Sequence, residues 1–213
     1  MYPMDFEEFL WATGNNVRWN VTRELFTKRK QLDDMTHRIM TGRFRQYLIV
    51  GGMPQVVMRH IETKGDFLEE DKEKRRILTL YRDDIQKHAG THAYKVEAIF
   101  DKLEFNKGML VENVIAQMLV MAGRQLFFFS KYDKSNASER MVVDFLIAKS
   151  KLGGHKNISP IEVKSSKNYA TVSLDKFRRK YRPYIDTPYV LHTGDLSVMP
   201  EVTYLPLYMT PLL

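Results

Sequence analysis

The spacing of apolar and polar residues changes character near the middle of the 213-residue chain. In roughly the first 105 residues, the pattern favours helices over strands. Asp5 is a candidate helix cap, and the run Gly51-Gly52-Met53-Pro54 must end a helix because paired glycines and a proline cannot continue one. The helices expected here cover residues 6–11, 22–40, 44–50, 56–61, 69–88 and 93–103. The apolar stripe of the long charged helix would include Ile77, Leu80, Tyr81 and Ile85.

The second half predicts strands mixed with helices. Residues 109–122 form a nearly all-apolar helical stretch, and the helix expected over 172–181 carries Leu174, Phe177 and Tyr181 on one face. Runs typical of strands occupy residues 126–130, 141–148, 158–164, 189–192 and 202–208. This order predicts a mixed α/β (α+β) fold, with a helical region over 1–105 and an α/β domain over 106–213. Within the first strand, Phe127-Phe128-Phe129 predicts a buried segment, with a base-stacking platform as the alternative.

Charge is also unevenly distributed between the two halves. The chain has 33 Lys and Arg against 26 Asp and Glu, a net charge of +7. Residues 1–105 are nearly neutral, whereas residues 106–213 hold 15 basic and 9 acidic side chains. Such a surplus predicts an anionic partner, or else a solvated basic surface. The helix that begins at residue 172 contributes Lys176, Arg178, Arg179, Lys180 and Arg182, which could contact phosphates.

Composition excludes several other classes of protein. The absence of cysteine excludes disulfide frameworks, thiolate zinc sites and cysteine nucleophiles. No apolar run approaches the ~18 residues that a membrane span needs, and the first residues do not resemble a signal peptide. We therefore expect a cytoplasmic protein that does not associate with membranes.

Three acidic residues interrupt apolar segments of the second half. Asp144 lies inside the strand expected over 141–148, and a carboxylate buried there needs a partner. Glu162 and Lys164 are two residues apart on the next strand, so they share one face. Antiparallel pairing of the two strands would bring Asp144 beside them. Glu112 is a similar exception in the apolar helix that precedes these strands.

This combination predicts a metal site that acts on phosphate esters. Asp144, Glu162 and Glu112 would supply the oxygen ligands that Mg²⁺ or Mn²⁺ prefers, with Glu112 as an auxiliary ligand. Lys164 would be the catalytic base or would stabilise charge on the scissile phosphate. The alternative is a buried salt bridge between Lys164 and Glu162 or Asp144 that has no catalytic role.

The spacing of these residues resembles the PD-(D/E)xK nuclease superfamily. The resemblance rests on Asp144, the Glu162-x-Lys164 pair and Glu112 on the preceding helix, although Val143 replaces the proline of the motif. It implies a restriction-endonuclease-like mixed sheet flanked by helices. It also implies metal-dependent action on nucleic acid bound by the basic second half, with DNA favoured over RNA.

A wider resemblance covers most of the chain. Residues 2–10, 47–54, 81–85 and 107–113, with the segments around Asp144 and Glu162, resemble bacterial and archaeal AAA-type ATPases that have a C-terminal domain of unknown function. The first half would then be a lid- or linker-like region. The phosphate-binding loop G-x-x-x-x-G-K-[ST] is missing, so we expect no ATP binding by this chain. The family's mid-chain segment is also missing at 103–106. An inactive regulatory module that binds an ATPase domain is the alternative function.

Overall fold

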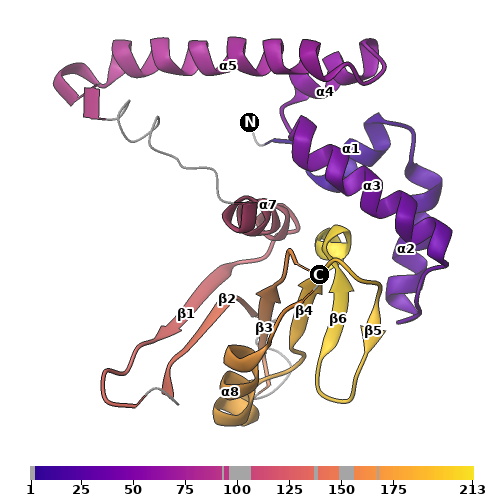
Figure 1. Ribbon diagram of the computed structural model, residues 1–213, viewed down its shortest axis with the longest axis vertical. Coiled ribbons are helices and arrows are strands. Elements are labelled where there is room, and N and C mark those ends of the chain that lie inside the picture. The colour runs from indigo at the N-terminus through magenta and orange to yellow at the C-terminus, as the bar shows by residue number, and fades with distance from the viewer. Residues whose placement is uncertain (1–2, 93, 96–106, 137–138, 149–155, 167) are drawn as a thin grey trace.

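A group of helices and a mixed sheet meet around a single core (Figure 1). The computed structural model describes residues 3–92, 94–95, 107–136, 139–148, 156–166 and 168–213. The helical half consists of α1 (Phe6–Ala12), α2 (Asn16–Thr27), α3 (Asp34–Val50), α4 (Pro54–Glu62), α5 (Phe67–His88) and the 3₁₀ turn η1 (Gly90–His92). None of the described helices is long and apolar enough to cross a membrane.

The first helix forms where the sequence predicts it. Asp5 accepts a hydrogen bond from the backbone N–H of Glu8, whose side chain accepts one from the N–H of Asp5, and this capping box fixes the start of α1. Phe6, Phe9 and Leu10 are then buried on one face of the helix. The start of the chain is also fixed, because the Met4 N–H donates to the carbonyl oxygen of Gly52 at 2.7 Å.

The prediction of one helix over 22–40 is wrong, because the helix is interrupted within that range. The prediction of a separate helix over 44–50 is also wrong. α2 ends at Thr27, and α3 runs without a break from Asp34 to Val50. The chain turns at Arg29, which adopts a left-handed conformation (φ 53°). Asp33 then caps α3 by accepting a hydrogen bond from the Thr36 N–H. At the other end of α3, the predicted interruption is confirmed: Gly51 takes a positive φ, and Pro54 begins α4.

The long helix α5 is much less buried than the apolar positions along its predicted face indicate. Ile77 is buried, but Leu80 and Tyr81 are exposed, because α5 packs mainly against the short α4. Its other buried residue is Glu70, which pairs with His60 of α4. The helix expected over 93–103 falls almost entirely outside the described residues.

The second half forms one six-stranded mixed sheet, which confirms the predicted fold class. The elements are α7 (Lys107–Met121), β1 (Leu126–Lys131), β2 (Met141–Ala148), β3 (Ile158–Val163), α8 (Val172–Tyr181), η4 (Arg182–Tyr184), β4 (Tyr189–His192), β5 (Ser197–Val198), β6 (Thr203–Pro206) and η5 (Leu207–Leu212). The strand order is β1-β2-β3-β4-β6-β5. The three central strands β3, β4 and β6 are parallel, and the outer pairings are antiparallel. The two-residue strand β5 was not predicted, because so short a strand has no readable alternation.

Both halves contribute to the main core. Ile115, Met118 and Leu119 of α7 pack in the same cluster as Phe6 and Phe9 of α1. The C-terminal turn η5 joins them, since it contacts α1, α2, α3 and α7 as well as β4 and β6. The helical region is therefore packed on the α/β part through the end of the chain. The predicted domain boundary at 105/106 falls outside the residues that the structure describes, so it stays a prediction.

Candidate functional site

Asp144 lies where β2 and β3 separate. The two strands are antiparallel, as predicted, and their pairing runs from Ala148↔Ile158 to Phe145↔Ile161. At the next position the backbone ladder ends, and Oδ2 of Asp144 accepts the backbone N–H of Val163 at 2.7 Å. The Asp144 carboxylate thus reaches β3 directly between the two other predicted residues, Glu162 and Lys164.

A bulge in β2 gives Asp144 this position. Phe127 pairs with Leu146 and Phe129 pairs with Val143, so two residues of β2, Asp144 and Phe145, lie opposite the single residue Phe128 of β1. An extra residue bends a strand and redirects its side chains. The effect is visible in the packing: Met141 and Val143 join a cluster with Phe177 of α8, whereas Phe145 and Ile147 join the main core.

Glu162 and Lys164 share one face of β3, as predicted. Lys164 Nζ lies 2.7 Å from Oε1 of Glu162 in an ion pair. Glu162 is only 5% exposed, and its Oε2 is buried without a hydrogen-bond partner among the described residues. A buried carboxylate oxygen without a partner is costly, so this atom marks a place where a cation or a donor would be favourable.

The pKa values of the three acidic residues at the site are all raised above their ordinary values. Burial raises the pKa of Asp144, and the hydrogen bond from Val163 and the charge of Lys164 oppose this only in part. Burial also raises the pKa of Glu162 against the opposing effect of Lys164, and the charge of Asp144 raises it further. Burial and then the charge of Asp144 raise the pKa of Glu112. The three acids and Lys164 therefore form one electrostatically coupled group.

Asp144 and Glu162 are the residues of this group that would hold a metal ion. Glu112 is linked to Asp144 and Lys164 through charge, from its half-buried place on α7. Among the described residues, no group of three or more His, Asp or Glu side chains is arranged to hold a metal ion. Mg²⁺, however, is commonly bound through one or two carboxylates with water and phosphate completing its shell. The donor set of Asp144 and Glu162 fits that requirement, and the auxiliary role of Glu112 stays a prediction.

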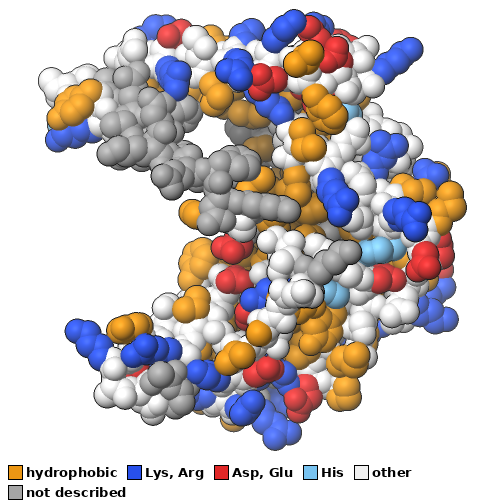
Figure 2. All heavy atoms as spheres, in the orientation of Figure 1, with side chains coloured by type: hydrophobic (Ala, Val, Ile, Leu, Met, Phe, Trp, Pro, Cys, Tyr) orange, Lys and Arg blue, Asp and Glu red, His pale blue; other side chains and the backbone are white. Residues whose placement is uncertain are grey.

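One side of the molecule carries a broad depression of the surface. Figure 2 shows the molecule hollowed between the α5 end and the β1–β2 hairpin, with acidic and basic side chains gathered below α7. Hydrophobic and basic side chains lie on the hairpin at the far side of the depression.

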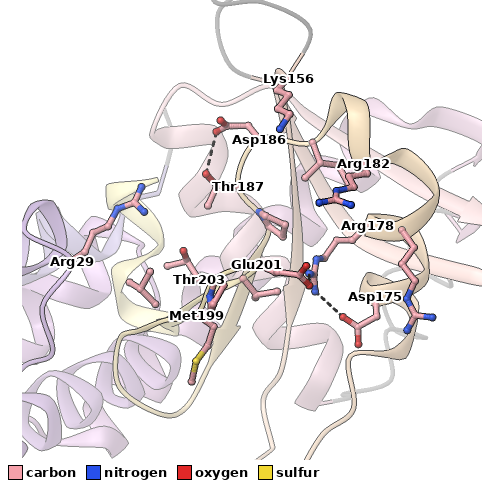
Figure 3. Close-up of a pocket in the computed structure, with 16 residues that line it drawn as sticks. Arg29, Lys156, Asp175, Arg178, Arg182, Asp186, Thr187, Met199, Glu201 and Thr203 are labelled. Carbon is pink, nitrogen blue, oxygen red and sulfur yellow. Dashed lines mark hydrogen bonds and ion pairs between the residues drawn. The ribbon is translucent and has the colours of Figure 1, made fainter.

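A second hollow lies beside α8 and is lined by several cations. Its walls include Arg178, Arg179 and Arg182, together with Lys156 and with Arg29 from the end of α2 (Figure 3). Arg178 is neutralised by Asp175 and Glu201. Within the described part of the chain, the other four cations have no carboxylate partner. The sequence pointed to the arginines of this helix, but not to Arg29 and Lys156, which only the fold brings to them.

The other basic residues of α8 are engaged. Lys180 pairs with Glu139, which also pairs with Lys131 of β1. Lys176 donates a hydrogen bond to the carbonyl oxygen of Arg140 at 3.2 Å. The basic residues of the predicted phosphate-contacting helix thus lie on two sides. Lys176 and Lys180 bind the β1–β2 hairpin, and Arg178 and Arg179 line the hollow.

In the segment Phe127-Phe128-Phe129, only Phe129 is even half-buried. Phe129 packs on Phe177 of α8 with ring centroids 4.8 Å apart, but Phe128 is 74% exposed and Phe127 is also exposed. The expectation of a buried strand is therefore wrong for two of the three residues. The reason is that β1 is an edge strand of the sheet, next to β2 alone.

A polar network beside Lys164 was not recognised from the sequence. The Lys164 N–H donates to the carbonyl oxygen of Leu191 at 2.8 Å, which sets His192 of β4 next to it. His192 contacts the Tyr169 hydroxyl at 2.9 Å and the Asp195 carbonyl at 3.1 Å. Asp195 in turn accepts the N–H of Leu32 at 3.1 Å, so the network continues into the helical half. These residues are dispersed along the chain, and no local pattern unites them.

Comparison with known protein families gives a match for the same part of the chain. Residues 107–209 match the family described as a domain of unknown function, DUF4143. That domain is found in AAA-ATPase-associated proteins. Its match begins at α7 and contains Glu112, Asp144, Glu162 and Lys164. Residues 41–122 match a second domain of unknown function, DUF8612. No curated protein and no solved structure matches the chain.

Proposed function

We propose that the DUF4143 part of this chain is a divalent-cation-dependent site for the hydrolysis of phosphodiester bonds in nucleic acid, with DNA as the favoured substrate. The observation that carries the proposal is the buried, unpartnered Oε2 of Glu162 beside Asp144 and the ammonium of Lys164. Glu70 of the structural Glu70–His60 pair also has a buried Oε2 without a partner among the described residues. Glu162 differs in having a second carboxylate, Asp144, whose charge acts on it, beside the ammonium of Lys164.

Asp144 and Glu162 would hold the cation. Burial raises the pKa of both carboxyl groups, so a positive ion between them would offset much of the cost of their ionisation. A bound Mg²⁺ or Mn²⁺ would supply stabilisation of the charge on a phosphate and a water that is easier to deprotonate. The bulge in β2 and the Val163 N–H keep the Asp144 carboxylate oriented towards β3, which is the positioning that such a site requires.

Lys164 would stabilise negative charge on the reacting phosphate. Its ammonium is partly exposed, with 23% of the side chain accessible, so it can reach a ligand while it stays paired with Glu162. The pair needs the protonated amine, which favours charge stabilisation over the role of a base. Glu112, whose pKa is raised by burial and by the charge of Asp144, would be an auxiliary acid that holds a water.

The second candidate is an inactive regulatory module that binds an ATPase domain. One observation favours it: Asp144 is already satisfied by the Val163 N–H, and Glu162 is already paired with Lys164. The occurrence of DUF4143 in ATPase-associated proteins is compatible with both functions. In this alternative the carboxylates only stabilise the junction of β2 and β3.

The test is cleavage of supercoiled plasmid and of a labelled oligonucleotide in the presence of Mg²⁺ or Mn²⁺. We expect cleavage by the wild type and a loss of about 100-fold or more for Lys164→Met, in line with the removal of one transition-state donor. Lys72→Met is the matched control, because this lysine is exposed on α5 far along the chain from the site. Equal rates for wild type and Lys164→Met would remove Lys164 from the mechanism, and no metal-dependent cleavage would favour the regulatory module.

A further inference from the structure

The β1–β2 hairpin presents aromatic rings to solvent. Phe128 of β1 is 74% exposed, and Tyr132, directly after the strand, is 72% exposed. The hairpin extends away from α7 and the helical half in Figure 1, and β1 forms the outer edge of the sheet. Isolated exposed aromatics are common, but Phe127, Phe128 and Tyr132 are all exposed on one hairpin next to a candidate site, which calls for a specific explanation.

Phe128 is placed beside the candidate site by the same bulge that positions Asp144. Because Phe127 pairs with Leu146 and Phe129 with Val143, Phe128 lies across from Asp144 and Phe145. Residues that oppose one another in antiparallel strands have Cα atoms about 4.5–5.5 Å apart. One edge of the Phe128 ring is supported by Phe145, with centroids 5.7 Å apart, which restrains the ring while the remainder stays exposed.

Positive charge lies beside Tyr132, the ring at the end of the hairpin. The guanidinium of Arg140 lies over the Tyr132 ring, 4.9 Å from its centroid, and its hydrogen bonds go to the carbonyl oxygens of Asp133 and Lys134. The ammonium of the exposed Lys134 has no carboxylate partner within the described part of the hairpin. An exposed ring beside a cation, as at Tyr132 and Arg140, is a combination that binds the bases and the phosphates of a nucleic acid.

We infer that the hairpin holds a single-stranded segment of nucleic acid, with one base stacked on Phe128 and adjacent phosphates near Lys134 and Arg140. The inference rests on the proposed function, since it assigns the substrate class of that site. A base inside a duplex is covered on both faces by its neighbours, so only an unpaired base or a strand end offers a face to Phe128. Single strands and frayed ends are therefore the substrates favoured over intact duplex.

The exposed edge of β1 has one other conceivable occupant, a strand from another protein or a second copy. Lys131, at the end of β1, opposes this, because a lysine on an edge strand disfavours pairing with another strand. Lys131 is paired with Glu139, so the cations that favour a polyanion are Lys134 and Arg140, which lie between β1 and β2. Self-association is kept as an outcome of the test.

The test compares single-stranded and duplex DNA binding in EDTA, where no cleavage occurs. Fluorescence anisotropy would follow a labelled oligothymidylate of about 20 nucleotides and a mixed-sequence duplex of the same length. Phe128→Leu keeps an apolar side chain against Phe145 but removes the aromatic face, and Phe128→Trp restores one. We expect Phe128→Leu to weaken single-strand binding by about 5- to 100-fold and duplex binding far less, with Phe128→Trp close to wild type. Leu68→Ala, exposed on α5, is the control for a nonspecific surface change.

Several results would overturn the inference. They are no binding of the oligothymidylate by the wild type, unchanged binding by Phe128→Leu, or equal losses for single strand and duplex. A dimer in sedimentation that Phe128→Leu dissolves would assign the edge to self-association instead. The outcomes also separate the two proposals: aromatic-dependent binding without cleavage defeats only the hydrolysis, and cleavage with unchanged binding by Phe128→Leu defeats only the stacking.

Discussion

Asp144 takes the place of a backbone acceptor where β2 and β3 part. Its carboxylate accepts the Val163 N–H that would otherwise continue the ladder, so the side chain is part of the sheet as well as of the candidate site. This placement destabilises the free protein, because a half-buried carboxylate near Glu162 and Glu112 is ionised at a cost. Residues that destabilise the free protein in this way are typical of functional sites.

Replacement of Asp144 by asparagine should therefore stabilise the protein without metal. The amide oxygen of the new side chain would still accept the Val163 N–H, while the ionisation cost disappears. A carboxyl group with a raised pKa binds protons more readily in the folded state, so its contribution to stability falls as pH rises from the unfolded-state pKa through the folded-state pKa. We expect Asp144→Asn to have a higher Tm than wild type at pH 8, and the difference to shrink as the pH falls towards about 4.

Thermal unfolding monitored by circular dichroism in EDTA across this pH range measures the effect. Asp133→Asn is the control, because the hydrogen bonds from Ser135 and Asn136 lower the pKa of that residue. Its replacement should lower the Tm slightly or leave it unchanged. A lower Tm for Asp144→Asn at pH 8 would show that the charge is stabilising, and the description of a costly carboxylate would be incorrect.

At the scale of elements, the sequence predicted best where a pattern is local. The bounds of β2 and α8 agree to the residue with the predicted 141–148 and 172–181. The break between α2 and α3 was missed because it depends on a left-handed arginine, Arg29, with no glycine or proline to mark it. The bulge in β2 could not be predicted either, since it exists only in the pairing with β1. The convergence of Asp144 with Glu162 and Lys164 was predictable because strand periodicity and one hairpin define it.

The attachment of α5 depends on one buried polar pair. Glu70 is fully buried and pairs with His60, whose other ring nitrogen contacts Gln46 at 2.9 Å. Loss of one partner from a buried pair costs about 3–5 kcal/mol, so Glu70→Ala should release α5 from α4. Hydrogen exchange would then accelerate across residues 67–88 and remain slow in the sheet.

A matched change on the same helix gives the comparison. Glu73 pairs with Arg76 near the surface of α5, and such pairs contribute about 0.2–1 kcal/mol. Glu73→Ala should leave the exchange of α5 almost unchanged. Similar exchange rates for the two variants would mean that α5 is held by its apolar contacts, such as Ile77, and not by the Glu70–His60 pair.

At the scale of the whole molecule, two places hold basic side chains that have no carboxylate partner among the described residues. One is the β1–β2 hairpin, and the other is the hollow beside α8 with Arg29, Lys156, Arg179 and Arg182 (Figure 3). The hollow is connected to the candidate site through Asp175, which lines it and whose charge raises the pKa of Glu162. A nucleic acid bound at the carboxylates could thus also contact the hollow.

Removal of charge from the hollow should change the salt dependence of binding. Each phosphate contact that is lost reduces the slope of log K against log salt concentration by about 1, so Arg179→Ala with Arg182→Ala should reduce it by about 2. Anisotropy titrations at several salt concentrations provide the measurement. The double variant Lys72→Ala and Arg75→Ala removes two exposed cations from α5 and serves as control. An equal slope for wild type and the hollow variant would separate this hollow from nucleic-acid binding.

The central claim is that Asp144 and Glu162 form a cation site and not a closed salt-bridge network. Titration calorimetry of the intact chain with Mn²⁺ tests it most directly. We predict one Mn²⁺ bound per chain, with an affinity that weakens as pH falls, because protons compete with the ion for carboxyl groups whose pKa values burial raises. Asp144→Asn and Glu162→Gln should each abolish this binding, and Asp133→Asn should not. No binding by the wild type, or the same binding by Asp144→Asn, would contradict the claim.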